Sequence, residues 1–414
     1  MKKVFLLLAA VACIAVSCKD KEEKGPVLTP DQNKETLDET MTKAVEMLEV
    51  ENWQSTADLI TASLEVFQSI EASDASYEEW IEGQSIETTL RDEEPYEYLI
   101  DLSKVNGKVS IKDNKVYAEA GTGLSVAYNL ADGTAVDGKI TVKNSKTTAL
   151  IDTDYNNNWD ADGNLNQTLW SKTYLVIPAS IDAVVNAGGK KAFSAKITTD
   201  VNMAGEEPKP TDTFAATCEV SADKYTFAVT RAKYSQTEVV VNASIKYDKQ
   251  TVVAATFEAK GKIETTEDGT DIDPLTSTGN VKASFGILDN IVIKGDLNWT
   301  EISKLVNAER GNTEAEAKAL AATAEKYMNL TLYIQHTAQA KLGWEAYIPY
   351  QDESMTVWSI QPVVRFEDGS DYMLPEAFFN EANFPKTVEA VNKALAEMNA
   401  FLGGGEEEEV EPLK

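Results

Sequence analysis

Residues 239–259 read VVVNASIKYDKQTVVAATFEA and carry the clearest structural signal in the chain. Apolar side chains occupy every second position from Val239 to Tyr247 and again from Val253 to Ala259, with mostly polar residues between them. A period of two is typical of β-strands that have one dry and one solvated face. Because Asp248-Lys249-Gln250 is a turn signal, the segment predicts an antiparallel hairpin of two long strands.

The same alternation extends in both directions, so residues 91–300 are expected to form an antiparallel β meander. Phe193, Ala195 and Ile197, for example, share one parity. Turn signals recur at Asp132-Gly133, Asp137-Gly138, Asp162-Gly163 and Gly188-Gly189. About ten strands are expected between Tyr96 and Leu297, and a sheet of that width should curl or split.

Helical patterns precede the β region, in residues 29–90. Thr29-Pro30-Asp31-Gln32 has the residue types of a capping box with proline at the first helical position. Two helices are then predicted from apolar residues at helical spacing. Their expected core-facing positions are Leu37, Met41, Ala44, Val45 and Leu48 in the first helix, and Ala57, Ile60, Leu64 and Phe67 in the second.

The C-terminal region, residues 301–402, mixes helical and strand periods and is expected to pack on the same sheet. A second capping box, Thr313-Glu314-Ala315-Glu316, opens an alanine-rich helix. Strands follow, and a final helix ends before Gly403-Gly404-Gly405. The glutamate-rich residues 403–414 are expected to be disordered. The predicted fold class is α+β, with a wide, curled antiparallel sheet of long strands packed on N-terminal and C-terminal helices.

The first residues have the layout of an export signal. Lys2 and Lys3 precede the apolar residues 4–16, a stretch shorter than the roughly 20 residues that span a bilayer. Small residues then lead into Cys18, and this arrangement resembles the lipobox of bacterial lipoproteins. The resemblance implies that the signal peptide, residues 1–17, is removed and that Cys18 is acylated. Residues 18–28 would then be a tether, and an ordinary cleaved signal is the alternative.

Two further segments resemble outer-membrane lipoproteins of the Bacteroidetes type. The charged residues 19–23 resemble the acidic export tag that follows the lipidated cysteine in those proteins. Residues 358–384, with the hairpin sequence FEDGS and the helix start PEAFF, are similar to the C-terminal part of uncharacterised members. The resemblance implies an outer-membrane address and exposure at the cell surface, and a body that faces the periplasm is the alternative. It implies no activity.

Composition excludes several classes of protein. The chain has 414 residues, 68 Asp+Glu against 38 Lys+Arg and a net charge of -30, which disfavours a nucleic-acid surface. Its single histidine, His336, excludes zinc sites built on several imidazoles. Of three cysteines, Cys13 lies in the signal and Cys18 would carry lipid, so Cys218 has no disulfide partner in the mature chain.

One acidic segment has residue types that suit calcium. Aspartate and asparagine alternate before Gly163, as in loops that supply oxygen ligands to this ion. The candidate ligands are Asp152, Asp154, Asn156, Asn158, Asp160 and Asp162. An EF-hand-type loop that starts at Asn158 would place Leu169 where a bidentate glutamate is required. A hairpin loop whose side chains bond its own backbone is therefore the alternative.

The remaining candidates are single residues. Trp159 could stack on a sugar ring, although most tryptophans fill a core. His336 shares the parity of Leu332 and Ile334 and is expected on the dry face of a strand. Cys218 is expected to be a small buried apolar residue. The sequence has no Gly-rich phosphate loop and no Gly-x-Ser-x-Gly motif, so no catalytic residue is predicted.

These observations favour a lipid-anchored, non-catalytic binding or interaction module. A carrier that holds a lipid or another apolar ligand in a groove of the curled sheet is one alternative. A surface glycan hydrolase is another, and it would require a cleft with converging carboxylates. The expected partners are the membrane, through the lipid on Cys18, and an unknown glycan, lipid or protein ligand. Nucleic acid is not expected, and calcium is the one cofactor for which there is a candidate site.

Overall fold

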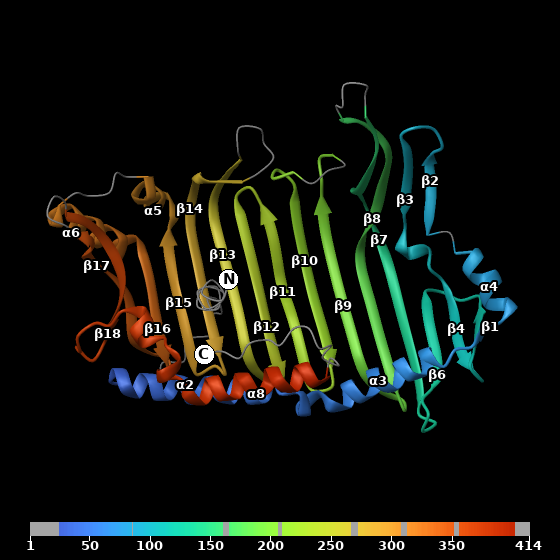
Figure 1. Cartoon of the computed structure of the whole chain (residues 1–414), viewed down its shortest axis with the longest axis horizontal. Helices are drawn as coiled ribbons and strands as arrows, with labels where there is room; N and C mark the ends of the chain where they lie inside the picture. The colour runs from blue at the N-terminus through green and yellow to red at the C-terminus, as the bar shows by residue number, and fades with distance from the viewer. Residues whose placement is uncertain are drawn as a thin grey trace. The chain divides into compact units, whose positions relative to one another are not determined.

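The structure, a computed structural model, describes residues 25–84, 86–159, 165–205, 209–265, 272–307, 313–351 and 356–401. The chain divides into two compact units. Figure 1 labels the helices and strands of both. Unit 1 comprises Met1–Asn52 and Gln236–Lys414, and unit 2 comprises Trp53–Ser235. The fold class is α+β with curled, mostly antiparallel sheets, which confirms the prediction from the sequence.

Unit 1 combines a meander of strands with helices from both ends of the chain. Its described strands are β12 (Glu238–Tyr247), β13 (Gln250–Thr265), β14 (Ile272–Ile287), β15 (Ile291–Asn298), β16 (Met328–Ile334), β17 (Thr337–Gln351) and β18 (Thr356–Phe366). Its described helices are α2 (Pro30–Met47), α5 (Trp299–Asn307), α6 (Glu314–Tyr327), α7 (Pro375–Phe378), η3 (Glu381–Asn383) and α8 (Pro385–Phe401). A 3-10 turn, η1 (Val50–Trp53), follows α2.

Each strand of unit 1 pairs antiparallel with the next in sequence. In the hairpin of β12 and β13, Val241 lies opposite Phe257 and Ile245 lies opposite Val253, as the alternation predicts. Asp248, in the turn, has a positive φ of 54°. Such left-handed residues match the twist of two-residue hairpins, which explains why aspartate occurs there. Both predicted capping boxes, at Thr29 and Thr313, are confirmed.

The core of unit 1 lies where helices cover one end of the sheet. Leu37 of α2 packs there with strand residues such as Ile334 and with Phe378 and Phe384 from the C-terminal region. Phe378 is completely buried, and Ile334 is only 2% exposed. Burial of apolar surface is the main source of stability, so this cluster holds the two terminal regions onto the sheet.

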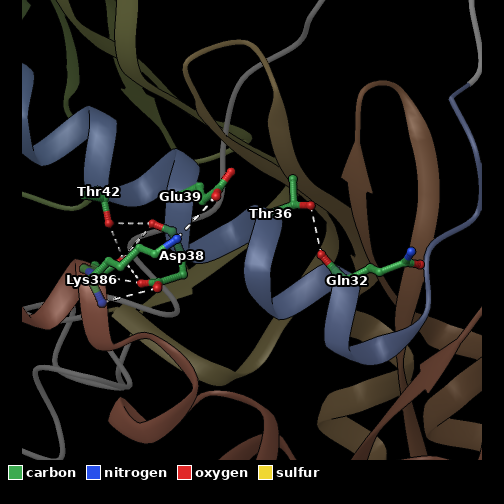
Figure 2. A network of polar contacts seen from close by, with 7 residues as sticks. Gln32, Thr36, Asp38, Glu39, Thr42 and Lys386 are labelled. Carbon is green, nitrogen blue, oxygen red and sulfur yellow. Dashed lines mark hydrogen bonds and ion pairs between the residues drawn. The ribbon is translucent and has the colours of Figure 1, made fainter.

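A polar junction joins α2 to α8 beside that core (Figure 2). Asp38, only 4% exposed, accepts hydrogen bonds from the backbone N–H groups of Lys386 at 3.2 Å and Thr387 at 2.8 Å. The Thr387 hydroxyl donates to the same carboxylate at 2.8 Å. The first N–H groups of a helix have no partner within it. Asp38 therefore caps α8, although it lies about 350 positions earlier in the chain.

Replacing Asp38 with alanine is expected to lower the free energy of unfolding by about 1–3 kcal/mol, because the partly buried N–H groups at the start of α8 lose their acceptor. Urea denaturation followed by circular dichroism measures the change. Asp31→Ala is the matched control, since Asp31 lies in the same helix with its side chain 92% exposed, and the loss of its exposed ion pair with Lys34 should cost less than about 1 kcal/mol. Equal losses in the two variants would contradict the capping role.

Unit 2 is built mainly from strands. They are β1 (Ala72–Ser73), β2 (Glu87–Arg91), β3 (Tyr96–Ile100), β4 (Gly107–Lys112), β5 (Lys115–Glu119), β6 (Leu124–Asn129), β7 (Ala135–Trp159), β8 (Leu165–Ala187), β9 (Lys190–Asn202), β10 (Thr213–Ala222) and β11 (Tyr225–Ser235). Its described helices are α3 (Gln54–Gln68), α4 (Ala75–Glu82) and the short η2 (Leu102–Lys104).

The strands from β6 to β11 form consecutive antiparallel pairs, whereas three pairs in unit 2 are parallel. The parallel pairs are β1–β5, β3–β8 and β4–β6. The purely antiparallel prediction was wrong at these points, because periodicity identifies strands but not their partners. Gly188-Gly189 forms the predicted turn between β8 and β9. Asp137-Gly138 does not turn but lies inside β7.

The predicted core face of α3 is largely open. Ala57 is completely buried, but Ile60 is 47% exposed, Leu64 52% and Phe67 43%. Near its start, α3 contacts the β10–β11 turn, where Ser55 donates to Asp223 at 2.5 Å. In its second half, Ser63 accepts from the hydroxyl of Tyr128 in β6 at 2.8 Å. The prediction that this stripe faces a core was therefore wrong for three of its four residues. A helical period shows that a stripe exists and not whether anything covers it.

Candidate binding surface

One face of unit 2, formed by residues 136–142 of β7, residues 181–187 of β8 and the strands β9–β11, is largely free of charged side chains. The register places Lys190 on this side, opposite Ala187 and next to the turn between β8 and β9. Directly paired residues in an antiparallel sheet point to the same side. The register therefore places Ile140, Ala183, Ala195, Val220 and Phe227 in one row on this side. The apolar face, as it is named below, comprises Val136, Gly138, Ile140, Val142, Ile181, Ala183, Val185, Ala187, Phe193, Ala195, Ile197, Thr199, Val201, Phe214, Ala216, Cys218, Val220, Ala222, Tyr225, Phe227, Val229, Ala232 and Tyr234.

The opposite side of the same strands is polar. One row contains Lys139, Val184, Ser194, Ser221 and Thr226. Another places Asp182 next to Lys196, which in turn lies opposite Glu219. This part of the sheet of unit 2 is thus amphipathic, with one polar side suited to contact with water and one apolar side.

The apolar face retains large exposed side chains. Ile140 is 43% exposed, Phe214 41% and Phe227 43%. Within the described part of the chain, β9 and β10 make extensive contacts only with other strands. A continuous apolar surface of this kind is uncommon on a soluble monomer and is typical of an interaction site.

In unit 1 the corresponding rows are partly covered by helices. The row that runs through Ile291 and Ile334 lies in the helix-covered core. The row with Val241 and Phe257, further along the strands, is open, and these residues are 40% and 38% exposed. Helix coverage therefore decides which apolar strand residues become core and which remain available for contact.

The four predicted calcium ligands that the structure describes do not converge. Asp152, Asp154, Asn156 and Asn158 lie along strand β7, paired with β8. A strand rises about 3.3 Å per residue, so Asp152 and Asn158 are about 20 Å apart and cannot bind one ion. Asp160 and Asp162 lie outside the described residues. Asp152, Asp154 and Asn156, which lie along the strand, are therefore not ligands of such a loop. A calcium site in the loop that starts at Asn158 stays a prediction.

Two other predicted sites lie where the structure gives no side-chain description. Cys18, the predicted lipidation site, is outside the described residues. Trp159 is the last residue of β7, but its side chain is not among those described. The proposed acylation and sugar contact therefore stay predictions.

His336 does not lie on the dry face of a strand, so that prediction was wrong. β16 ends at Ile334, and His336 is an exposed residue in the turn to β17. Gln335 and His336 both have positive φ, 49° and 64°, as in a type I′ hairpin turn. The alternation that places Leu332 and Ile334 inside ends one residue before the turn, so parity no longer applies to His336.

Cys218 has the predicted parity but is not buried. It lies on the apolar face, opposite Ile197 of β9 and Val229 of β11, and is partly exposed. The sequence predicted the side of the strand correctly and assumed that a second layer would cover it. The open face contradicts that assumption.

A charged pocket of about 320 Å³ lies beside α6 in unit 1. The charges that line it are already paired, since Arg365 contacts Glu325 at 3.3 Å and Lys341 contacts Glu367 at 2.6 Å. The hydrogen bond to Glu367 raises the pKa of Lys341 above its usual value. A ligand would have to displace these ion pairs, so the pocket is a poor candidate for binding or catalysis.

Other kinds of site find no support in the described residues. The second well-formed hollow is an open groove along α8, lined by residues such as Glu381, Val388 and Glu389. Neither hollow is an enclosed apolar cavity. Among the described side chains, no group of three or more His, Cys, Asp or Glu could hold a metal ion. No helix in the described part of the chain is long and apolar enough to cross a membrane.

Sequence reasoning missed two features of potential functional importance. The exposure of the apolar face has no sequence signal, because an uncovered apolar row has the same alternation as a covered one. The contacts of Gln339 with the segment before α2, described below, join residues more than 300 positions apart. Comparison of the chain with protein-family models, curated proteins and solved structures finds no significant match.

Proposed function

We propose that this protein is an outer-membrane lipoprotein, anchored through Cys18 and exposed at the cell surface, that acts as a non-catalytic binding module. The apolar face of unit 2 is its binding surface, and an uncharged acyl chain or a similar extended apolar molecule is its ligand. The observation that carries the proposal is the apolar face with its half-exposed phenylalanines, on which the one charged residue in the paired rows, Lys190, lies next to the β8–β9 turn. The anchor rests on the lipobox-like residues before Cys18.

The energetics of the apolar face support an apolar occupant. Covering the part of Phe227 that remains exposed contributes about 2 kcal/mol at the usual value per unit area. Phe214 and Ile140, with similar exposure, add comparable amounts. A ligand that lies along these strands can therefore reach useful affinity through contact area alone.

Two observations favour an acyl chain over a protein partner. Protein interfaces contain about one hydrogen bond per 100–200 Å², whereas the apolar face offers few polar groups. One of them, the Thr199 hydroxyl, already donates to the Pro178 carbonyl. A second copy of the chain would also bring a net charge of -30 against another -30. An uncharged apolar ligand meets neither obstacle.

Titration with a dansyl-labelled long-chain fatty amide, which is uncharged, tests the proposal. We expect saturable fluorescence enhancement with the wild-type chain and at least tenfold weaker binding with Phe227→Asp, a loss of about 1.4 kcal/mol. The carboxylate places a charge in the middle of the apolar face and removes the aromatic ring. The matched control is Val184→Asp, on the polar side of the same sheet, where the side chain is 38% exposed.

Three results would overturn the proposal. Unchanged affinity in Phe227→Asp would mean that the probe binds elsewhere. Equal losses in Phe227→Asp and Val184→Asp would indicate a general effect on the sheet. Concentration-dependent dimerisation without probe binding, measured by sedimentation and abolished by Phe227→Asp, would assign the apolar face to a second copy of the chain.

A further inference from the structure

The segment immediately before α2, residues 25–28, is held by side chains of strand β17. Gln339 of β17 is 1% exposed, and both atoms of its carboxamide bond to this segment. Its Oε1 accepts from the Leu28 N–H at 2.7 Å, and its Nε2 donates to the Pro26 carbonyl at 2.9 Å. The hydroxyl of Thr337 donates to the Gly25 carbonyl at 2.9 Å.

The α2 side of the same segment is also fixed. Asn33, completely buried, donates to the Leu28 carbonyl at 3.3 Å. The Leu28 side chain packs against the core cluster of unit 1. A buried amide that loses its partners costs about 1–3 kcal/mol. The chain from Gly25 to Leu28 is therefore part of the folded body and not a free linker.

The clamped segment lies at one defined end of unit 1. Thr337 follows the Gln335-His336 turn and pairs with Ile334. In the register, Ile334 lies opposite Ile291, and Ile291 lies opposite Ile287, next to the turn between β14 and β15. The turns at 248–249, 288–290 and 335–336 are therefore at the same end of the sheet, which is named the turn end below.

The clamp limits how far the turn end can be from Cys18. Gly25 lies seven positions after Cys18, and an extended chain covers at most about 3.5 Å per residue, or about 25 Å in all. If the clamp were released up to Thr29, eleven residues would be free and the reach would grow to about 40 Å. The clamp thus shortens the tether and fixes the point at which it leaves the body.

We infer that the clamp formed by Gln339 and Thr337 makes the turn end of unit 1 the side that stands next to the lipid surface. This inference rests on the proposed acylation of Cys18. The strands of unit 1 then rise from the membrane, and α5 lies at the far end, because it begins directly after β15 ends at Asn298. From Ile291 to Asn298, the strand alone adds about 23 Å of height.

Energy transfer from a labelled residue to the membrane tests this orientation. The full chain, acylated in a bacterial host and carrying Cys218→Ser, is placed in phosphatidylcholine vesicles that contain a rhodamine-labelled lipid. A donor dye is attached at His336→Cys in the turn or at Lys304→Cys in α5, both exposed positions. We expect several-fold more efficient transfer from position 336 than from position 304.

Release of the clamp should reduce that difference. In Gln339→Leu the two hydrogen bonds to Pro26 and Leu28 are lost, so the tether lengthens and the two transfer efficiencies should approach each other. Thr337→Val, which removes only the bond to Gly25, serves as a milder variant should Gln339→Leu not fold. Circular dichroism of each variant shows that the body is intact.

The outcomes separate the inference from the proposed function. A chain that floats with the vesicles but transfers energy equally from the two positions, or better from 304, would overturn the orientation while leaving the lipid anchor in place. A chain that does not float with the vesicles would overturn the anchor itself, and the orientation with it. Cys18→Ser, which cannot be acylated, is the reference for a chain that does not float.

Discussion

Replacing Phe378 with alanine is expected to lower the free energy of unfolding of unit 1 by about 3–5 kcal/mol. Phe378 is completely buried, and its ring lies 5.4 Å from that of Phe366 and 6.5 Å from that of Phe384. It therefore joins strand β18 to the region just before α8. Alanine would remove the ring and leave a cavity that these neighbours can fill only in part.

Urea denaturation measures the loss, and hydrogen exchange followed on peptides assigns it to unit 1. The neighbouring residue provides a matched control, since Phe379 is 47% exposed although its ring lies 4.8 Å from that of Phe378. Phe379→Ala should cost less than about 1.5 kcal/mol, because much of its surface already faces water. If the two alanine variants lost equal stability, Phe378 would not be the centre of this core.

The second large effect is expected at Gly295, in the middle of β15. A Cβ atom there would overlap the carbonyl oxygen of Asn329 and approach the Leu330 backbone within 2.9 Å, both on the paired strand β16. Backbone atoms cannot rotate away as a side chain can, so the two strands would have to separate. Gly295→Ala should therefore destabilise unit 1 by about 2–3 kcal/mol.

Thermal denaturation checks this prediction against a second glycine of the same sheet. At Gly286, in β14, the nearest atom to an added Cβ is the Ile291 carbonyl oxygen at 3.7 Å, an ordinary contact. Gly286→Ala should keep or slightly raise the melting temperature, because alanine restricts the unfolded chain. A comparable fall in both variants would show that close backbone approach is not what requires glycine at 295.

Local patterns predicted the parts of the fold that depend on neighbours in sequence. The hairpin of residues 239–259 has the expected register, and both capping boxes form because they involve residues only three positions apart. His336 shows the limit of the method. Strand parity holds only inside the strand, and the type I′ turn after Ile334 turns the histidine toward solvent.

Features that depend on distant partners could not be predicted. Nothing near Gln339 indicates that its amide bonds to residues 26 and 28, and nothing near Asp38 indicates a helix start at 386. The candidate binding surface shows the same limit. The alternation in β9 and β10 predicted which residues face the dry side, but coverage of that side depends on elements elsewhere in the chain.

The bond between Asp38 and the start of α8 has a consequence for the order of folding. Each hairpin of unit 1 joins adjacent segments and can form as soon as both strands have emerged, since short loops close at little entropic cost. Helix α2 has no such local partner, because α8 and Gln339 are synthesised more than 300 residues later. The leading helix of this unit therefore cannot complete its contacts until nearly the whole chain has been synthesised, so the N-terminal region is the last part of unit 1 to dock.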